Sequence, residues 1–141
     1  MRVRAMRMLA RREYSRHELQ TRLSAPDADP AEVQEVLDEF EAKGWLSEQR
    51  FVDSVVRARR QRFGTARVLR ELRDKGVSDE GLGEAREALA AGELDAARQV
   101  WQKKFGQAPL SLAERAKQTR FLAGRGFSAD VIRCILDGRE D

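Results

Sequence analysis

The sequence has few of the residues on which many functional sites depend. Its 141 residues include one cysteine, one histidine and three prolines, and only 6% are aromatic. The single cysteine, Cys134, cannot form a disulfide within the chain and fits a reducing cytosol. The single histidine, His17, cannot build a two-histidine metal site or an obvious Ser–His pair. We therefore expect no enzyme, no metal centre and no cofactor.

Long apolar segments are also missing. No run approaches the ~18 residues that a membrane-spanning helix needs, and the basic start of the chain lacks the apolar segment of a signal peptide. The Gly-x-x-x-x-Gly-Lys-Ser/Thr loop that binds nucleotide phosphates is absent as well. The sequence predicts a cytoplasmic protein without a membrane partner.

Sustained alternation of apolar and polar residues, the pattern of a half-buried strand, does not occur, whereas helical spacing recurs along the chain. Helices are predicted at residues 2–13, 15–24, 30–43, 48–63, 65–75, 79–91, 93–105, 112–124 and 129–137. The predicted N-caps are Ser15, Ser47, Thr65, Ser78, Ser111 and Ser128, and the predicted helix-ending glycines are Gly44, Gly76 and Gly126.

The predicted helices repeat in order. Residues 75–78 (KGVS) match residues 125–128 (RGFS), and residues 18–23 echo residues 67–72. One unit of ~45 residues is marginal alone, so stacked units would bury their open faces. We predict an all-α fold of three tandem three-helix repeats, similar to helix-turn-helix units, in an elongated or curved array. The predicted repeats are residues 1–46, 47–91 and 92–141; the alternative is one irregular bundle with accidental similarity.

The charges come in blocks that a net charge of only +3 conceals. Residues 57–75 hold eight basic residues against two acidic ones, and residues 25–56 hold nine acidic residues against two basic ones. We predict that the basic block binds a partner; the alternative is a solvated face with Arg67–Glu71 and Arg70–Asp74 pairs. The candidate residues are Arg57, Arg59, Arg60, Arg62, Arg67, Arg70, Arg73 and Lys75.

Arg59 and Arg62 favour the binding interpretation. On a helix that continues to residue 63, both fall on the apolar side with Phe51 and Val55. Burial of two unpaired guanidinium groups there would be very costly. We therefore predict that the last turns of this helix extend beyond the core and carry both groups to solvent or to a partner.

Acidic residues gather in the third predicted helix of the first two units, while basic residues gather in the helices before them. If the units stack in one orientation, the molecule has a basic side and an acidic side. The basic side would suit phosphates or an acidic protein groove. The alternative is that the acids pair with neighbouring basic helices. For the aromatic residues Tyr14, Trp45 and Trp101, core packing is favoured over base stacking.

Four segments resemble the RecX family. They are residues 11–19 (RREYSRHEL), 44–51 (GWLSEQRF), 64–72 with 75–77 (GTARVLREL, KGV), and 120–133 with its RFL, RGFS and IR groups. The resemblance covers nearly the whole chain in order. It departs from the family pattern at residues 25–30 (APDADP), where the family often has a basic Gly-aromatic turn, and at residues 47–49 (SEQ).

The resemblance implies a regulator of DNA repair and the SOS response that binds the RecA–DNA filament. It implies suppression, or in some members tuning, of RecA's ATP hydrolysis, strand exchange and co-protease activity. It also implies weak, nonspecific binding of single- or double-stranded DNA, and we expect a monomer. One alternative is a sequence-nonspecific DNA-binding module without RecA dependence, since no helix carries an obvious base-reading set. Another is a helical scaffold for a different acidic partner.

Overall fold

The structure, a computed structural model, describes residues 1–138. Over that range the chain forms nine α-helices and no strand, which confirms the predicted all-α fold. The helices are α1 (Arg2–Arg11), α2 (Arg16–Leu23), α3 (Pro30–Ala42), α4 (Glu48–Arg59), α5 (Thr65–Asp74), α6 (Asp79–Ala90), α7 (Glu93–Lys104), α8 (Leu112–Gly124) and α9 (Ala129–Leu136).

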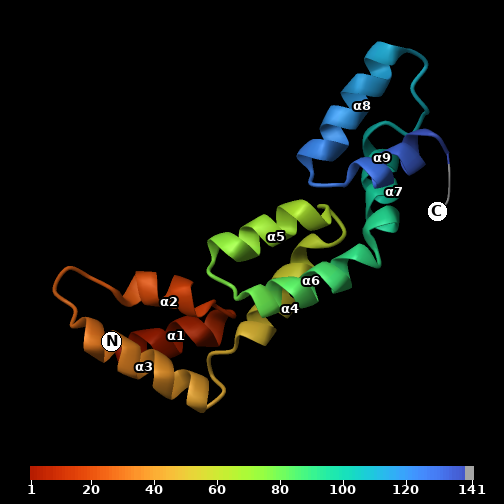
Figure 1. The fold of residues 1–141 in the computed structure, drawn as a ribbon. Coiled ribbons are helices and arrows are strands. Elements are labelled where there is room, and N and C mark those ends of the chain that lie inside the picture. Colours follow the sequence, from red (N-terminus) through yellow and green to blue (C-terminus); the bar gives the residue numbers. More distant parts are fainter. Residues whose placement is uncertain (139–141) are drawn as a thin grey trace.

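Three separate hydrophobic cores divide the helices into consecutive units of three. Leu19 and Phe40 are fully buried in the core of α1–α3, Leu72 in that of α4–α6, and Leu122 in that of α7–α9. Figure 1 shows the units following one another in an elongated array, with α2, α5 and α8 along the same side. Tandem three-helix repeats are thus confirmed, while the unit boundaries at 46/47 and 91/92 stay a prediction.

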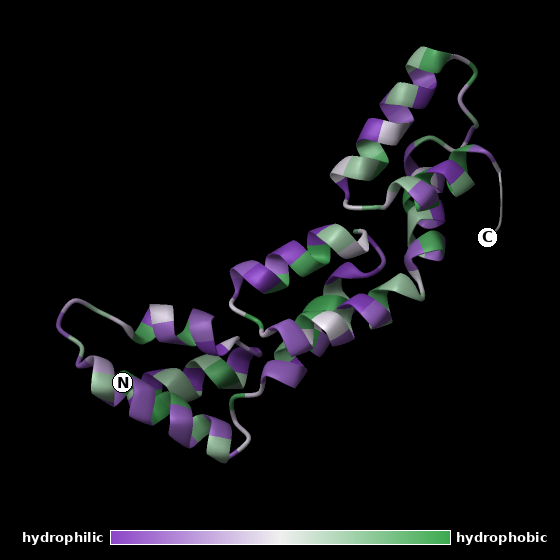
Figure 2. Cartoon of the chain, viewed as in Figure 1, coloured by the Kyte–Doolittle hydropathy of each residue, from purple (hydrophilic) through white to green (hydrophobic). Residues whose placement is uncertain are grey.

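Each helix is buried on one side only. Figure 2 shows apolar and polar patches alternating along the same helices, as expected when a thin core lies between three amphipathic helices. Serine side chains at five helix starts accept a hydrogen bond from the N–H three residues later, so these predicted caps are confirmed. The Thr65 prediction is wrong: Gly64 is the N-cap of α5, and Thr65 is the first helical residue.

Core packing is confirmed for two of the three aromatic residues considered. Tyr14 is buried in the first core, and Trp101 is partly buried, with its Nε1–H donating to Gln118 Oε1 at 2.9 Å. Trp45 is 40% exposed, so its predicted place in the core is wrong. Gly44 turns the chain with a φ of 74°, and the next core residue is Leu46. Trp45 instead lies edge-on to Phe40 on the outside of the first unit.

Candidate partner-binding surface

The structure separates the eight predicted binding residues into two groups. Five side chains are exposed and make no ion pair or side-chain hydrogen bond within residues 1–138. The other three hold the fold or the joints between units. The exposed group is Arg57, Arg60, Arg62, Arg70 and Arg73, and the structural group is Arg59, Arg67 and Lys75.

Arg59 and Arg62 do not lie together on one extended helix, so that prediction is wrong. Helix α4 ends at Arg59, so Arg62 lies in the turn that follows. The Arg59 side chain is 42% exposed, and its Nε donates to Glu71 Oε1 at 3.1 Å. Glu71 belongs to α5 and was the predicted i, i+4 partner of Arg67. The pair between α4 and α5 removes the cost of a lone guanidinium beside the apolar face.

Arg67 connects the second unit to the third. Its guanidinium lies over the Phe63 ring at 4.2 Å and donates to the Gly124 carbonyl at 3.4 Å. Its Cβ also comes so close to Gly126 that a Cβ on that glycine would lie 2.5 Å away. The start of α5 therefore packs directly on the glycine turn after α8.

The backbone closes this second joint. The Gly64 N–H donates to the Arg125 carbonyl at 2.7 Å, and the Arg125 guanidinium donates to the Arg62 carbonyl at 3.2 Å. A Cβ on Gly64 would lie 2.3 Å from the Gly126 carbonyl carbon, so only glycine permits this approach. The orientation of the second and third units is thus fixed by main-chain contacts.

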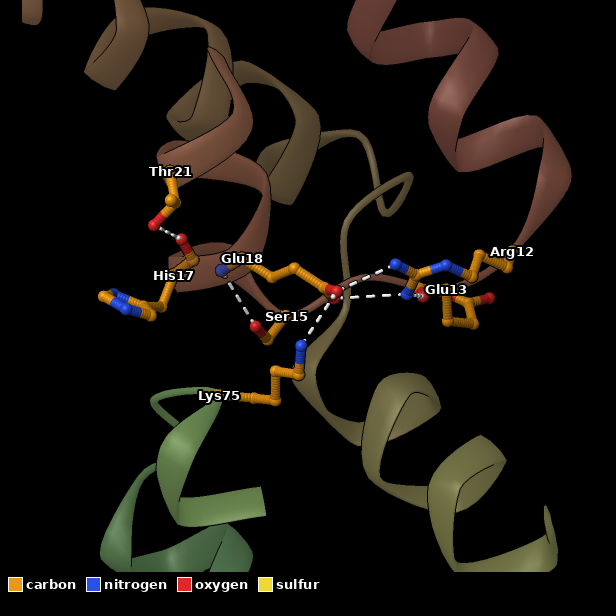
Figure 3. A network of polar contacts seen from close by, with 7 residues as sticks. All are labelled: Arg12, Glu13, Ser15, His17, Glu18, Thr21 and Lys75. Carbon is orange, nitrogen blue, oxygen red and sulfur yellow. Dashed lines mark hydrogen bonds and ion pairs between the residues drawn. The ribbon is translucent and has the colours of Figure 1, made fainter. Parts of the chain in front are cut away.

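Charged side chains close the first joint, between α2 and the end of α5 (Figure 3). Glu18 is only 8% exposed, and its Oε2 accepts from Arg12 at 2.8 Å and from Lys75 at 3.3 Å. Burial acts to raise the pKa of Glu18, but the hydrogen bonds from Arg12 and Lys75 outweigh it, so the pKa lies below its usual range. The Ser15 hydroxyl accepts from the Glu18 N–H, which fixes the residue at the start of α2.

The exposed arginines do not form one patch. Arg70 and Arg73 project from α5, whereas Arg57 lies on α4 and Arg60 is its C-cap. Because α4, α5 and α6 all pack against one another, the outward faces of α4 and α5 point in different directions. The predicted single contact surface is therefore replaced by two exposed faces and by a third basic site around Arg62.

This third site is a groove between the second and third units that the sequence prediction missed in large part. It has a volume of about 440 Å³ and brings Arg62 together with Lys103, Lys104 and Arg125. The repeat pointed to one residue of this groove. Arg125 is the first residue of RGFS and corresponds to Lys75 of KGVS, which belongs to the predicted basic block. Lys103 and Lys104 could not be predicted from the repeat, since they lie near Arg62 only because of how the units stack.

Three of the five acidic residues of α3 pair with basic helices of their own unit, which confirms the alternative prediction for these three. Arg2 lies 2.6 Å from Glu39, and Arg16 lies 2.8 Å from Asp38 and 2.5 Å from Glu41. The hydrogen bond from Arg2, helped by that from Lys43, lowers the pKa of Glu39 to about 2. The acids of α6 are instead exposed: Asp79, Glu80, Glu84 and Glu87.

Within residues 1–138, no helix combines the length and apolar character that crossing a membrane requires. The same part of the chain contains no group of three or more His, Cys, Asp or Glu side chains arranged to hold a metal ion.

Comparison with known proteins identifies the fold and its family. Three family descriptions match in order: the first three-helix domain of RecX at residues 2–40, the second at 47–85 and the third at 91–136. The chain belongs to the RecX family. The "Regulatory protein RecX" of Leptothrix cholodnii is 48% identical over 133 residues, which are 94% of this chain and 85% of that protein. The RecX of Ralstonia nicotianae is 45% identical and covers 99% of this chain and 88% of its own length.

A solved RecX structure has the same fold. The crystal structure of RecX from Lactobacillus salivarius superposes with a TM-score of 0.82 over 97% of this chain and 92% of that chain, at 17% identity. The fold is thus shared although most side chains differ. The sequence-level relatives are named regulatory proteins, a name that fits a non-enzymatic member of the RecX family.

Proposed function

We propose that this chain binds the RecA–DNA filament and modulates RecA, mostly by inhibiting its ATPase, strand-exchange and co-protease activities in DNA repair and the SOS response. The observation that carries the proposal is the ordered match of all three RecX domains over nearly the whole chain. The elongated array suits a partner that offers a long groove rather than a single pocket. The expected protein is a cytoplasmic monomer.

Arg57 and Arg60 belong to a separate exposed face at α4, and the contact surface we propose is the exposed basic face of α5. Arg70 and Arg73 are its centre, because they stand on a helix with a well-buried opposite face and make no ion pair within residues 1–138. Unpaired guanidinium groups are available for carboxylates or phosphates of a partner, where a bidentate contact is stronger than a neutral hydrogen bond.

The test is the rate of ATP hydrolysis by RecA on single-stranded DNA, with substoichiometric amounts of this protein. We expect the wild-type chain to lower the rate and Arg70→Ala/Arg73→Ala to lose much of the effect, with helicity unchanged by circular dichroism. The matched control is Lys43→Ala/Arg86→Ala, which removes two positive charges at or on the acidic helices α3 and α6. An equal loss in both double variants would contradict a specific surface.

The second candidate is a DNA-binding module that acts without RecA, and the five unpaired arginines favour it. Phosphate contacts supply sequence-independent affinity that weakens steeply with salt. An unchanged ATPase rate together with salt-sensitive DNA binding would favour this second function over the first.

A further inference from the structure

We propose that the groove between the second and third units binds the phosphodiester backbone of a nucleic-acid strand. The groove lies where the turn after α4, the end of α7 and the end of α8 meet (Figure 1). This inference deepens the proposed function, since it assigns a place on this chain to the DNA of the RecA–DNA filament. It does not need RecA itself and is tested without it.

Four cations converge on the groove from three separate segments. Arg62 comes from the turn, Lys103 and Lys104 from the last turn of α7, and Arg125 from the C-cap of α8. No carboxylate lines the groove, and none of the four makes an ion pair in the described part of the chain. Arg2, Arg12 and Arg16, by contrast, each have an acidic partner.

Helix dipoles alone do not account for four cations in this groove. Lysines at the end of α7 would be expected from its negative C-terminus alone. Three helix C-termini approach the groove, those of α4, α7 and α8, and each contributes roughly half a negative charge. Four full positive charges exceed that sum by more than two, so the groove remains strongly electropositive and suits an anion.

The apolar side of the groove strengthens its field. The Phe121 ring lies between Lys104, 5.5 Å from its centroid, and Arg125, 5.1 Å from it, and it meets Phe105 edge-on. Apolar walls with little water focus the potential of nearby charges on a bound anion. The ring contacts also restrain two flexible cations before a ligand arrives, which reduces the ordering cost of binding.

The shape of the groove favours a chain of phosphates over a single one. Arg62 lines both this groove and a second groove of about 260 Å³, whose lining also includes Arg67 and the Arg59–Glu71 ion pair. A row of cations thus runs from Lys103 through Arg62 to the start of α5. Cations in two adjoining grooves match the repeated phosphates of a polymer backbone, and guanidinium groups suit the oxygens of each phosphate. The two glutamines in the lining, Gln61 and Gln99, can donate to sugar or phosphate oxygens.

The experiment measures binding of fluorescein-labelled oligo(dT) by anisotropy, without RecA, at salt concentrations from about 50 to about 200 mM. We expect Lys103→Ala/Lys104→Ala to weaken binding by roughly tenfold at the low-salt end. Its slope of log K against log salt should fall by about 1.4, which corresponds to two lost phosphate contacts on a single strand. Lys103→Arg/Lys104→Arg keeps both charges and should restore affinity.

The matched control is again Lys43→Ala/Arg86→Ala, which lowers the net charge equally but lies outside the groove. An equal loss of affinity in the control would overturn the proposal, since net charge alone would then explain binding. Polyglutamate that competes as well as unlabelled oligo(dT) would assign the groove to an acidic polypeptide instead. Competition by inorganic phosphate at matched phosphate concentration would reduce it to an isolated-phosphate site.

The ATPase assay separates this inference from the proposed function. Groove-dependent oligo(dT) binding by a chain that leaves RecA hydrolysis unchanged supports the groove and refutes the proposed function. A wild-type chain that inhibits RecA but whose oligo(dT) binding is unaffected by Lys103→Ala/Lys104→Ala refutes the groove and retains the proposed function.

Discussion

The Gly64→Ala substitution tests how the second and third units are joined. Gly64 is buried at the N-cap of α5, and a Cβ there would lie 2.3 Å from the carbonyl carbon and oxygen of Gly126. Ordinary contact for such an atom begins near 3.4 Å, so the two backbones must separate by about 1 Å. The φ of Gly64 is −82°, which alanine adopts freely. The effect is therefore steric and acts between units.

The magnitude follows from the contacts that this separation breaks. The hydrogen bond from the Gly64 N–H to the Arg125 carbonyl, now 2.7 Å, would exceed hydrogen-bonding range. Its loss costs about 1 kcal/mol, and crowding in a packed contact costs about 1–3 kcal/mol more. Since neither hydrophobic core includes Gly64, we expect the joint to open while both units stay folded.

Small-angle scattering and circular dichroism check this expectation together. Gly64→Ala should increase the maximum dimension of the particle at unchanged helicity. Gly83→Ala is the control: Gly83 lies inside α6 with no neighbouring atom within 4 Å of a built Cβ. That variant should raise stability by up to about 1 kcal/mol without a change in shape.

A serine variant distinguishes the steric effect of a Cβ at position 64 from an effect on the capping of α5. Gly64→Ser adds the same Cβ but also supplies the hydroxyl that caps a helix. If Gly64→Ser scatters and melts like the wild-type chain, the alanine effect is a capping defect and the steric reasoning is refuted. Identical scattering curves for Gly64→Ala and Gly83→Ala would refute it equally.

Two further substitutions test the first joint and the second core. Glu18→Gln should lower the free energy of unfolding by roughly 1–2 kcal/mol at neutral pH, since the three hydrogen bonds from Arg12 and Lys75 lose their charge assistance and both cations are partly solvated. Because the pKa of Glu18 lies below its ordinary value of 4.5, this contribution is complete above about pH 4.5 and is lost as pH falls below it. Urea unfolding across this range should show the variant and wild type converging in acid, and a constant difference would contradict the role of the charge. Leu72→Ala, at a fully buried site, should cost about 2–5 kcal/mol in the same assay, and a loss below 1 kcal/mol would mean that the second core collapses around the gap.

The helices could be predicted from the sequence because their signals are local. An apolar stripe such as Val33, Val36, Leu37 and Phe40 decides which face is buried, and a serine or glycine a few residues away decides where the helix begins or ends. These effects act within one or two turns. For this reason the predicted bounds of α6, α7 and α9 differ from the structure by one residue each, at their C-terminal ends.

The end of α4 could not be predicted in the same way. Residues compatible with a helix continue to Phe63, yet the helix stops at Arg59 and the chain then turns so that Gly64 contacts the third unit. The partner of Glu71 depends on the same tertiary arrangement: Arg67 is its neighbour in sequence, but Arg67 turns to Phe63 and Gly124, and Arg59 takes its place. Local spacing offers only Arg67, because Arg59 lies twelve residues from Glu71 in sequence.

The candidate site was harder to predict than the helices, because it forms only when the second and third units stack. Nothing in the spacing of Arg62, Lys103 and Arg125 indicates that they share one groove, and they come from segments that join only when α5 packs on the turn after α8. Conversely, Lys75 was predicted as part of the binding surface because it lies in the basic block. It is held by Glu18, 57 residues away in sequence, and its charge is used within the molecule.

The two joints therefore differ in the kind of contact that fixes them, and this difference bears on how the array fits a partner. The first joint combines the ion pairs of Glu18, whose two cationic partners are 40% and 44% exposed and thus accessible to screening ions, with close packing of Gly76 on His17. The second joint depends on a main-chain hydrogen bond and on glycines that admit no side chain, neither of which salt weakens much. Units two and three are thus joined without an ion pair among the described residues, whereas the attachment of the first unit includes ion pairs that salt screens. Salt should therefore loosen the first joint more than the second when the array binds a partner across both.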